Sequence, residues 1–445
     1  MLTFKPPKFL WKRWKPSKST ELIPLSVLAM LLAFSVGWRF LKSSELQNHA
    51  YTYPFSLSSE NSGQETLERS ISFYQGRVQR NPEDGLDQAA LASAYLKMVR
   101  ATGNDSWYLL AEQSAQRSLT KLPFDNDGAV LVLARIAEAK HDFAEANRLA
   151  EQASGPEALA IIVTSNLAIG QVEAADAAAN TLVDLNPSLG SLTLRALSRS
   201  AQGDQDGAQR DFQQAIAAEE LSEPRGSAWT RTLLGRLYFQ QGNSALAGQL
   251  YREALQIVPD YPLAQLYLAE LETRLGHYRT AQQYYLQVND PVALHGIARI
   301  QALQGKAADA PWETAETALR QHIDENALGH RRDLAHLLLE RGNTEDVPEA
   351  IALMQAEASN RRDAKTLDLL AWSLSRAGRW QEAQQIIQEA LASGIQDAGI
   401  FYRAGVIETA LNRASQANQY FRLAQEIDPT FDQQARQRLG LVAHR

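Results

Sequence analysis

A stretch of 34 residues, 228–261, decides the fold; it reads AWTRTLLGRLYFQQGNSALAGQLYREALQIVPDY. Two later stretches of the same length, 364–397 and 398–431, follow each other without a gap and carry small and apolar residues at matching places. Recurrence at a period near 34 residues is typical of stacked helix hairpins. The sequence therefore predicts an all-α array in which each hairpin buries its apolar face against its neighbours.

The recurring residues have physical roles. A small residue in the first helix, such as Gly235, lets two helices approach closely, and an alanine such as Ala247 does the same in the second helix. Larger residues, such as Tyr251, are expected to fill the gap between hairpins. Gly242 suits a left-handed turn, and Pro259 ends the second helix because proline cannot continue a helix interior.

Together these residues resemble the tetratricopeptide repeat, whose pattern is matched by Leu234, Gly235, Tyr238, Ala247, Tyr251, Ala254 and Pro259. The resemblance implies a right-handed solenoid of about ten helix-hairpin repeats over residues 64–431. An unrelated helical bundle is the alternative, but a bundle has no reason to keep this period. The same register places the repeats at 85–126, 127–155, 156–188, 189–222, 228–261, 262–290, 291–327, 328–363, 364–397 and 398–431.

An apolar stretch precedes the array. Residues 22–41 read LIPLSVLAMLLAFSVGWRFL, with Arg39 as the single charge. Twenty such residues form a helix of about 30 Å, which is long enough to span a membrane. Residues 1–21 form a basic tail, so the positive-inside rule predicts a cytoplasmic N-terminus. A cleaved signal peptide is the alternative, although no clean cleavage site follows the apolar stretch.

The remaining segments and the charge distribution complete this organisation. Residues 42–63 are expected to form a polar linker, and residues 432–445 a C-terminal capping helix. Eight basic residues and one acid give residues 1–42 a charge of +7, whereas 36 basic and 50 acidic residues give the remainder −14. An acidic array argues against a nucleic-acid partner, because nucleic acid requires a basic surface.

No residue pattern points to catalysis, a metal or a cofactor. The chain has no cysteine, which excludes disulfides and thiolate chemistry. It contains no zinc-protease, nucleophile-elbow or phosphate-loop motif. His330 and His336 are six residues apart and therefore point to different faces of one helix. We expect no catalytic residues, no metal site and no cofactor.

Function is therefore expected in the concave groove. The family resemblance implies that the first helix of each hairpin lines this groove. Carried over position by position, it predicts partner-binding residues at Trp229, Arg236, Phe239, Arg274, His295, Arg299, Arg332, His336, Trp372, Arg376 and Tyr402. Arginine and aromatic side chains are common binding anchors. The alternative is that these arginines pair with acidic residues on adjacent helices.

The expected function is a non-catalytic, membrane-anchored scaffold or adaptor that binds protein partners and organises an envelope or photosynthetic complex. The alternative is a carbohydrate-associated subunit of a polysaccharide export or cell-wall machine. Either protein would span the inner or thylakoid membrane once, with its repeats in the periplasm or lumen.

Overall fold

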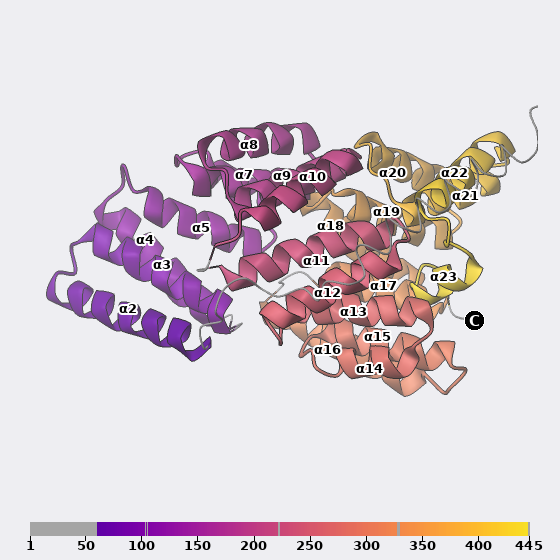
Figure 1. Cartoon of the computed structure of the whole chain (residues 1–445), viewed down its shortest axis with the longest axis horizontal. Coiled ribbons are helices and arrows are strands. Elements are labelled where there is room, and N and C mark those ends of the chain that lie inside the picture. The colour runs from indigo at the N-terminus through magenta and orange to yellow at the C-terminus, as the bar shows by residue number, and fades with distance from the viewer. Residues whose placement is uncertain (1–59, 103, 105, 221–222, 327–329, 444–445) are drawn as a thin grey trace, which may run out of the picture. The chain divides into compact units, whose positions relative to one another are not determined.

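The computed structural model describes residues 60–102, 104, 106–220, 223–326 and 330–443, and every regular element within them is a helix (Figure 1). None of these described helices is both long and apolar enough to cross a membrane. The predicted basic tail 1–21 and transmembrane helix 22–41 lie outside the described residues. The first described helix, α2 (Glu60–Arg80), begins within the predicted linker 42–63. Its Ile71 packs against the first hairpin, which explains why the helix belongs to the array.

Between α2 and the last helix, the described residues form ten helix hairpins, as the 34-residue period predicts. The first five hairpins are α3–α4 (Gly85–Thr102 and Ser106–Lys121), α5–α6 (Asp127–Ala139 and Phe143–Ala150), α7–α8 (Pro156–Ala168 and Val172–Leu185), α9–α10 (Leu189–Ala201 and Gln205–Ala217) and α11–α12 (Pro224–Gln240 and Ser244–Ile257). The last five hairpins are α13–α14 (Pro262–Leu275 and Tyr278–Tyr285), α15–α16 (Pro291–Leu303 and Asp309–Asn326), α17–α18 (Arg331–Arg341 and Val347–Asn360), α19–α20 (Ala364–Arg376 and Trp380–Ala392) and α21–α22 (Ala398–Ala410 and Ala414–Ile427).

The hairpins stack in chain order. Each helix packs against the next helix along the chain, and first helices also contact the first helices of adjacent hairpins, as in α9, α11 and α13. This double row is the packing expected of a solenoid, because each hairpin covers the apolar face of its neighbour.

Small residues produce the close helix approach that the sequence predicts. A side chain on Gly235 of α11 would collide with the Tyr251 ring of α12, and one on Gly405 of α21 would collide with the Phe421 ring of α22. Ala247 is fully buried as well. The aromatic ring thus fills the space that the missing side chain leaves.

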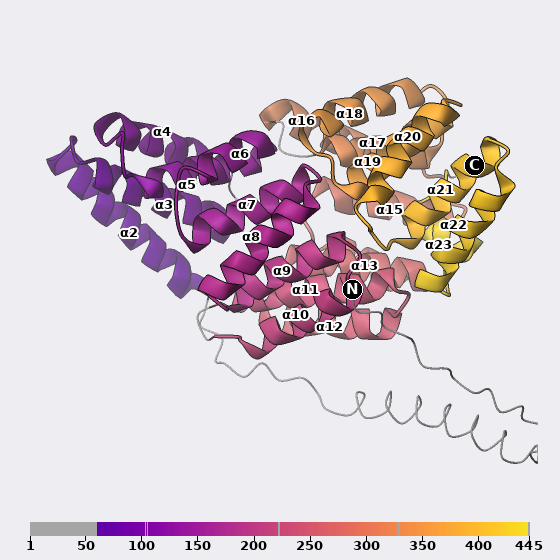
Figure 2. The ribbon, with the colours of Figure 1, turned by 90° about the horizontal axis from the view of Figure 1, so that it is seen from above.

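Hairpins far apart in the sequence also touch. Arg362 N donates to Ala168 O over 2.8 Å, which joins the end of α7 to the turn before α19. A side chain on Gly203 would collide with the Gly394 carbonyl oxygen. Figures 1 and 2 show α19–α20 (orange) beside α7–α10 (magenta). The C-terminal hairpins therefore meet the earlier ones through their turns, and this contact is called the closure of the array below.

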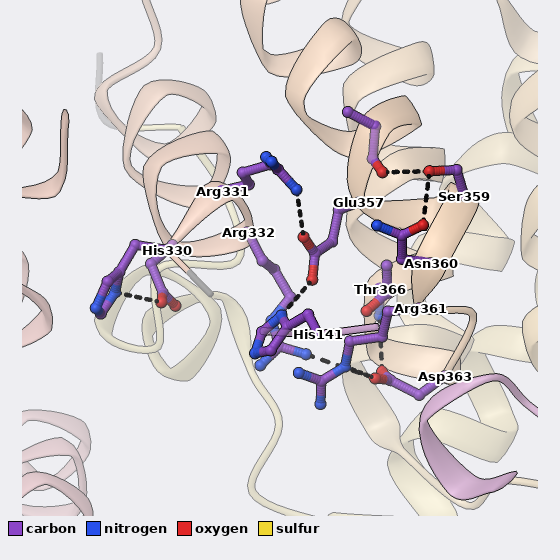
Figure 3. A network of polar contacts seen from close by, with 12 residues as sticks. His141, His330, Arg331, Arg332, Glu357, Ser359, Asn360, Arg361, Asp363 and Thr366 are labelled. Atoms are coloured by element: carbon purple, nitrogen blue, oxygen red, sulfur yellow. Dashed lines mark hydrogen bonds and ion pairs between the residues drawn. The ribbon is translucent and has the colours of Figure 1, made fainter. Parts of the chain in front are cut away.

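A polar network strengthens this closure (Figure 3). His141, in the turn between α5 and α6, lies 3.3 Å from the Glu357 carboxylate of α18 through its Nδ1 atom. Arg331 reaches the other Glu357 oxygen at 3.9 Å. Glu357 is almost fully buried, and burial alone would raise its pKa, but His141, followed by Arg361 and Arg332, holds the pKa below the usual range.

The C-terminal segment differs from the predicted capping helix 432–445. The helix α23 (Gln433–Arg438) has six residues and ends before Gly440, whose φ of 66° is left-handed. The segment turns back onto α13 and α15. Arg438 Nη1 donates to Arg274 O over 3.0 Å, and His336 Nε2 donates to Gly440 O over 2.9 Å. The C-terminus therefore contacts the groove itself, because Gly440 ends the helix and redirects the chain.

The closure can be tested at Gly203. Gly203→Ala adds a methyl group against the Gly394 carbonyl and also strains a backbone with φ of 85°. Gly378→Ala is the matched control, because Gly378 has φ of 72° and open space around it. Both variants lose about 1–2 kcal/mol through the backbone, and Gly203→Ala should lose about 1–3 kcal/mol more through overpacking. Equal free energies of unfolding in urea for the two variants would contradict the closure.

Candidate functional site

A cavity of about 380 Å³ lies within the array. Its walls come from the first helices α11, α13, α15, α17, α19 and α21, together with Asp428, Phe431, Leu439 and Leu441 of the C-terminal segment. Six consecutive hairpins and the returning C-terminus thus enclose one space. The cavity lies among the first helices, where the sequence predicts a groove.

Most of the predicted partner-binding residues meet here. Eight of the eleven line the cavity: Arg236, Phe239, Arg274, His295, Arg299, Arg332, His336 and Trp372. Tyr402 lies beside a separate hollow with Arg436 above its ring, at 4.4 Å from the ring centre. Trp229 packs at the α8–α9 core, and Arg376 Nη2 donates to Gly342 O over 3.0 Å.

The cavity arginines have acidic partners, which is the alternative that the sequence left open. Arg236 Nη1 lies 2.6 Å from Glu270 of the next first helix. Arg299 forms two 2.6 Å hydrogen bonds with Glu340. Arg332 is the exception, because its closest carboxylate oxygen, on Asp363, is 3.8 Å away.

Arginines also cover the aromatic rings of the cavity. The Arg236 guanidinium lies 5.0 Å from the centre of the Phe239 ring. Arg403 lies 4.5 Å from the centre of the Trp372 ring. Both rings are buried, so the faces proposed to grip a partner are largely occupied by cations of the chain itself.

The most deeply buried charges surround Glu340, whose side chain is 0% exposed. His295 Nε2 donates to Glu340 Oε2 over 2.8 Å, beside the two bonds from Arg299. Burial alone would raise the pKa of this carboxyl, but Arg299 and His295 outweigh burial and hold it well below the usual range. The surroundings of His336 disfavour its charged imidazolium form. Burial, followed by repulsion from His295, lowers its pKa to about 4.

The described residues contain no group of three or more histidine, aspartate or glutamate side chains placed to hold a metal ion. The rings of His322 and His330 pack edge to face, with centres 5.3 Å apart. His330 instead lies 3.2 Å from Asp333 through its Nδ1 atom. These histidines therefore take part in packing and ion pairing.

Sequence reasoning missed two cavity residues on α19, Lys365 and Asp368. The position rule that selected Trp372 and Arg376 in this hairpin also selects both of these residues, so the signal was present. The position rule could not find Glu340 or the contacts of the C-terminal segment. The pairs Arg299–Glu340 and His336–Gly440 join residues 41 or more positions apart, which is more than one repeat.

Removing Arg299 should therefore affect folding. Arg299→Gln leaves Glu340 buried without its main cation, which costs about 3–5 kcal/mol. Arg379→Gln, which breaks an exposed pair with Glu382, should leave the free energy of unfolding nearly unchanged. Chemical denaturation of both variants provides the measurement. An Arg299→Gln protein as stable as Arg379→Gln would show that the buried pair has no stabilising role.

The lowered pKa of His336 predicts acid sensitivity. Between pH 6.5 and about 4 the unfolded chain binds a proton at His336 and the folded chain does not, so stability falls as the pH falls. This effect amounts to about 2 kcal/mol between pH 7 and pH 5. His336→Gln should remove that part of the loss in urea unfolding at the two pH values. An unchanged pH dependence would contradict the assignment.

Comparison with known proteins adds two findings. The tetratricopeptide repeat family model matches residues 193–262 and 369–430. Cellulose synthase 1 operon protein C of Komagataeibacter xylinus is 25% identical over 331 residues, which cover 68% of this chain and 24% of that protein. The chain thus matches about a quarter of its relative's length. Tetratricopeptide repeats are present in this chain on both sides of the cavity, in the α9–α12 and α19–α22 regions.

Proposed function

We propose that this chain is a non-catalytic scaffold that binds protein partners of a polysaccharide synthesis or export system in the cell envelope. The main support for a binding role is that eight of the predicted groove residues line the same cavity. Tetratricopeptide repeats support protein partners, since stacked first helices present a continuous surface. The name of the relative, a cellulose synthase operon protein, supports the polysaccharide system.

The ion pairs narrow the set of residues available to a partner. Arg299 and Arg274 are buried with Glu340 and Asp428, so they hold the array together. Arg332 keeps 31% of its side chain exposed and has a long ion pair. A partner carboxylate can shorten its contact to Arg332 without breaking a buried pair. Arg332 is therefore the predicted residue best suited to recognition.

The proposed location follows the sequence expectation. Residues 22–41 would anchor the protein in the membrane, with the basic tail in the cytoplasm and the repeats on the opposite side. A reporter that is active only outside the cytoplasm, fused after Arg445, tests this arrangement. An inactive fusion in a stable protein would exclude it.

A second candidate is a subunit that binds the polysaccharide itself. The relative's name favours it, as does the cluster of aromatic side chains at the cavity. Against it, arginines lie over the Phe239 and Trp372 rings and leave little face for a sugar to stack on. Sedimentation of the full-length protein with purified cellulose distinguishes the candidates, because a protein scaffold should remain in the supernatant.

Crosslinking pull-down from membranes tests the scaffold directly. The wild-type chain should enrich proteins of polysaccharide synthesis or export, and Arg332→Gln should weaken their recovery about tenfold through loss of a charged contact. Arg379→Gln is the matched control. Its side chain is 39% exposed and pairs with Glu382, and it does not line the cavity.

The scaffold function and the assignment of the groove as the binding site can be contradicted independently. If no such protein is enriched by the wild-type chain, the scaffold function is wrong. If partners are recovered equally with both variants, the scaffold function stands and the groove assignment is wrong.

A further inference from the structure

Among the described residues, two cations in the cavity form no close ion pair or hydrogen bond with a carboxylate. Among the described residues, no carboxylate pairs with Lys365 Nζ, although the side chain lines the cavity. The Arg332 guanidinium lies 3.8 Å from Asp363 and makes no hydrogen bond within the described part of the chain. The other cavity arginines contact a carboxylate oxygen at 2.6 Å or less. Lys365 and Arg332 therefore stand apart.

The acidic residues nearby are already committed. Asp363 caps α19 through the Lys365 and Thr366 amides and also accepts from Arg361 (Figure 3). Asp397 caps α21 and accepts from Gln240 Nε2 over 3.1 Å. Neither carboxylate can move to Lys365 without giving up a helix cap, which contributes about 1 kcal/mol.

The surroundings of Lys365 as a whole disfavour the charged form of its ammonium group. Burial lowers the pKa of its ammonium group, and repulsion from Arg236 lowers it further. Asp397 and Glu270 act in the opposite direction but do not offset these effects. Lys365 lies at the start of α19 among the side chains that line the cavity, and the residue remains open to solvent. A bound anion would add negative charge beside its ammonium group.

We propose that the cavity binds a small anionic ligand through the Lys365 ammonium and the Arg332 guanidinium. This inference goes beyond the scaffold function, because it assigns a ligand to the inside of the groove. The planar Arg332 group can hold two oxygens of one anion, while Lys365 adds a compact charge. A carboxylate and a phosphate both meet that requirement.

The volume and the apolar lining of the cavity limit the size and polarity of the ligand. A volume of about 380 Å³ holds a ligand of moderate size, such as a single sugar ring carrying an acid group. Leu266, Leu369 and Leu441 provide an apolar wall. The ligand class is therefore a small carboxylate or phosphate with a body that partly contacts apolar surface.

Calorimetry on the full-length protein, at constant pH and ionic strength, tests the site. The probes are inorganic phosphate, glucuronate and uncharged glucose. Phosphate or glucuronate should bind and glucose should not. The anion that binds more tightly shows whether the natural ligand presents a phosphate or a carboxylate.

Lys365→Gln and Arg332→Gln should each lower the affinity about tenfold or more. Lys365→Arg should retain binding, which separates the role of charge from a folding defect.

Two control variants and a measurement of proton uptake on binding complete the test. Lys306→Gln alters an exposed lysine and Arg379→Gln alters an arginine whose side chain is 39% exposed, both outside the cavity, so both variants should bind as the wild type does. Titration in buffers of different ionisation heat should show proton uptake above the lowered pKa of Lys365, since the anion raises that pKa. If neither anion binds, or if the control variants weaken binding equally, the proposal is wrong.

Discussion

The contact between Gly203 and Gly394 is the constraint on which the rest of this structure depends. Each glycine lies in a turn, and a side chain on either one would collide with the backbone of the opposite turn. Two hairpins separated by 191 residues can therefore approach until their backbones touch, and the Arg362–Ala168 hydrogen bond continues that seam one hairpin earlier. Without this approach, α11, α13 and α15 would not face α17, α19 and α21 across one cavity.

Several charged side chains of the groove are buried, and this explains how they are arranged. A buried charge without a partner is costly, so each arginine drawn inward requires a carboxylate. Glu340 meets this need for Arg299 and also accepts from His295. The C-terminal segment takes part as well, because Asp428 pairs with Arg274. The arginine row that suggests a recognition surface in the sequence is thus largely a set of internal ion pairs. Arg332, with its 3.8 Å contact, is the member least committed to the fold.

The sequence predicts the hairpins well because their signals are local. Pro156, Pro262 and Pro291 begin first helices where the 34-residue register places them, and Gly235 meets Tyr251 as its spacing requires. The register also selects most of the residues that line the cavity. It does not predict the pairing of His141 with Glu357 or the return of the C-terminus, because a repeat period describes adjacent hairpins and contains nothing about contacts 216 residues apart. The helix expected over residues 432–445 is shorter in the structure, because α23 ends at Arg438 just before the left-handed Gly440.

These features couple the inside of the array to its outer surface. Lys365 and Arg332 come from one half of the cavity wall, whereas Arg236 and Glu270 belong to hairpins that meet them on closure. A ligand that contacts both walls binds the closed arrangement, so by mass action it stabilises that arrangement relative to an open one. A partner that recognises the closed surface must then raise the affinity for the ligand by the same factor by which the ligand raises the affinity for the partner. An anion bound at Lys365 and Arg332 would in this way favour the closed arrangement, in which Gly203 lies against Gly394.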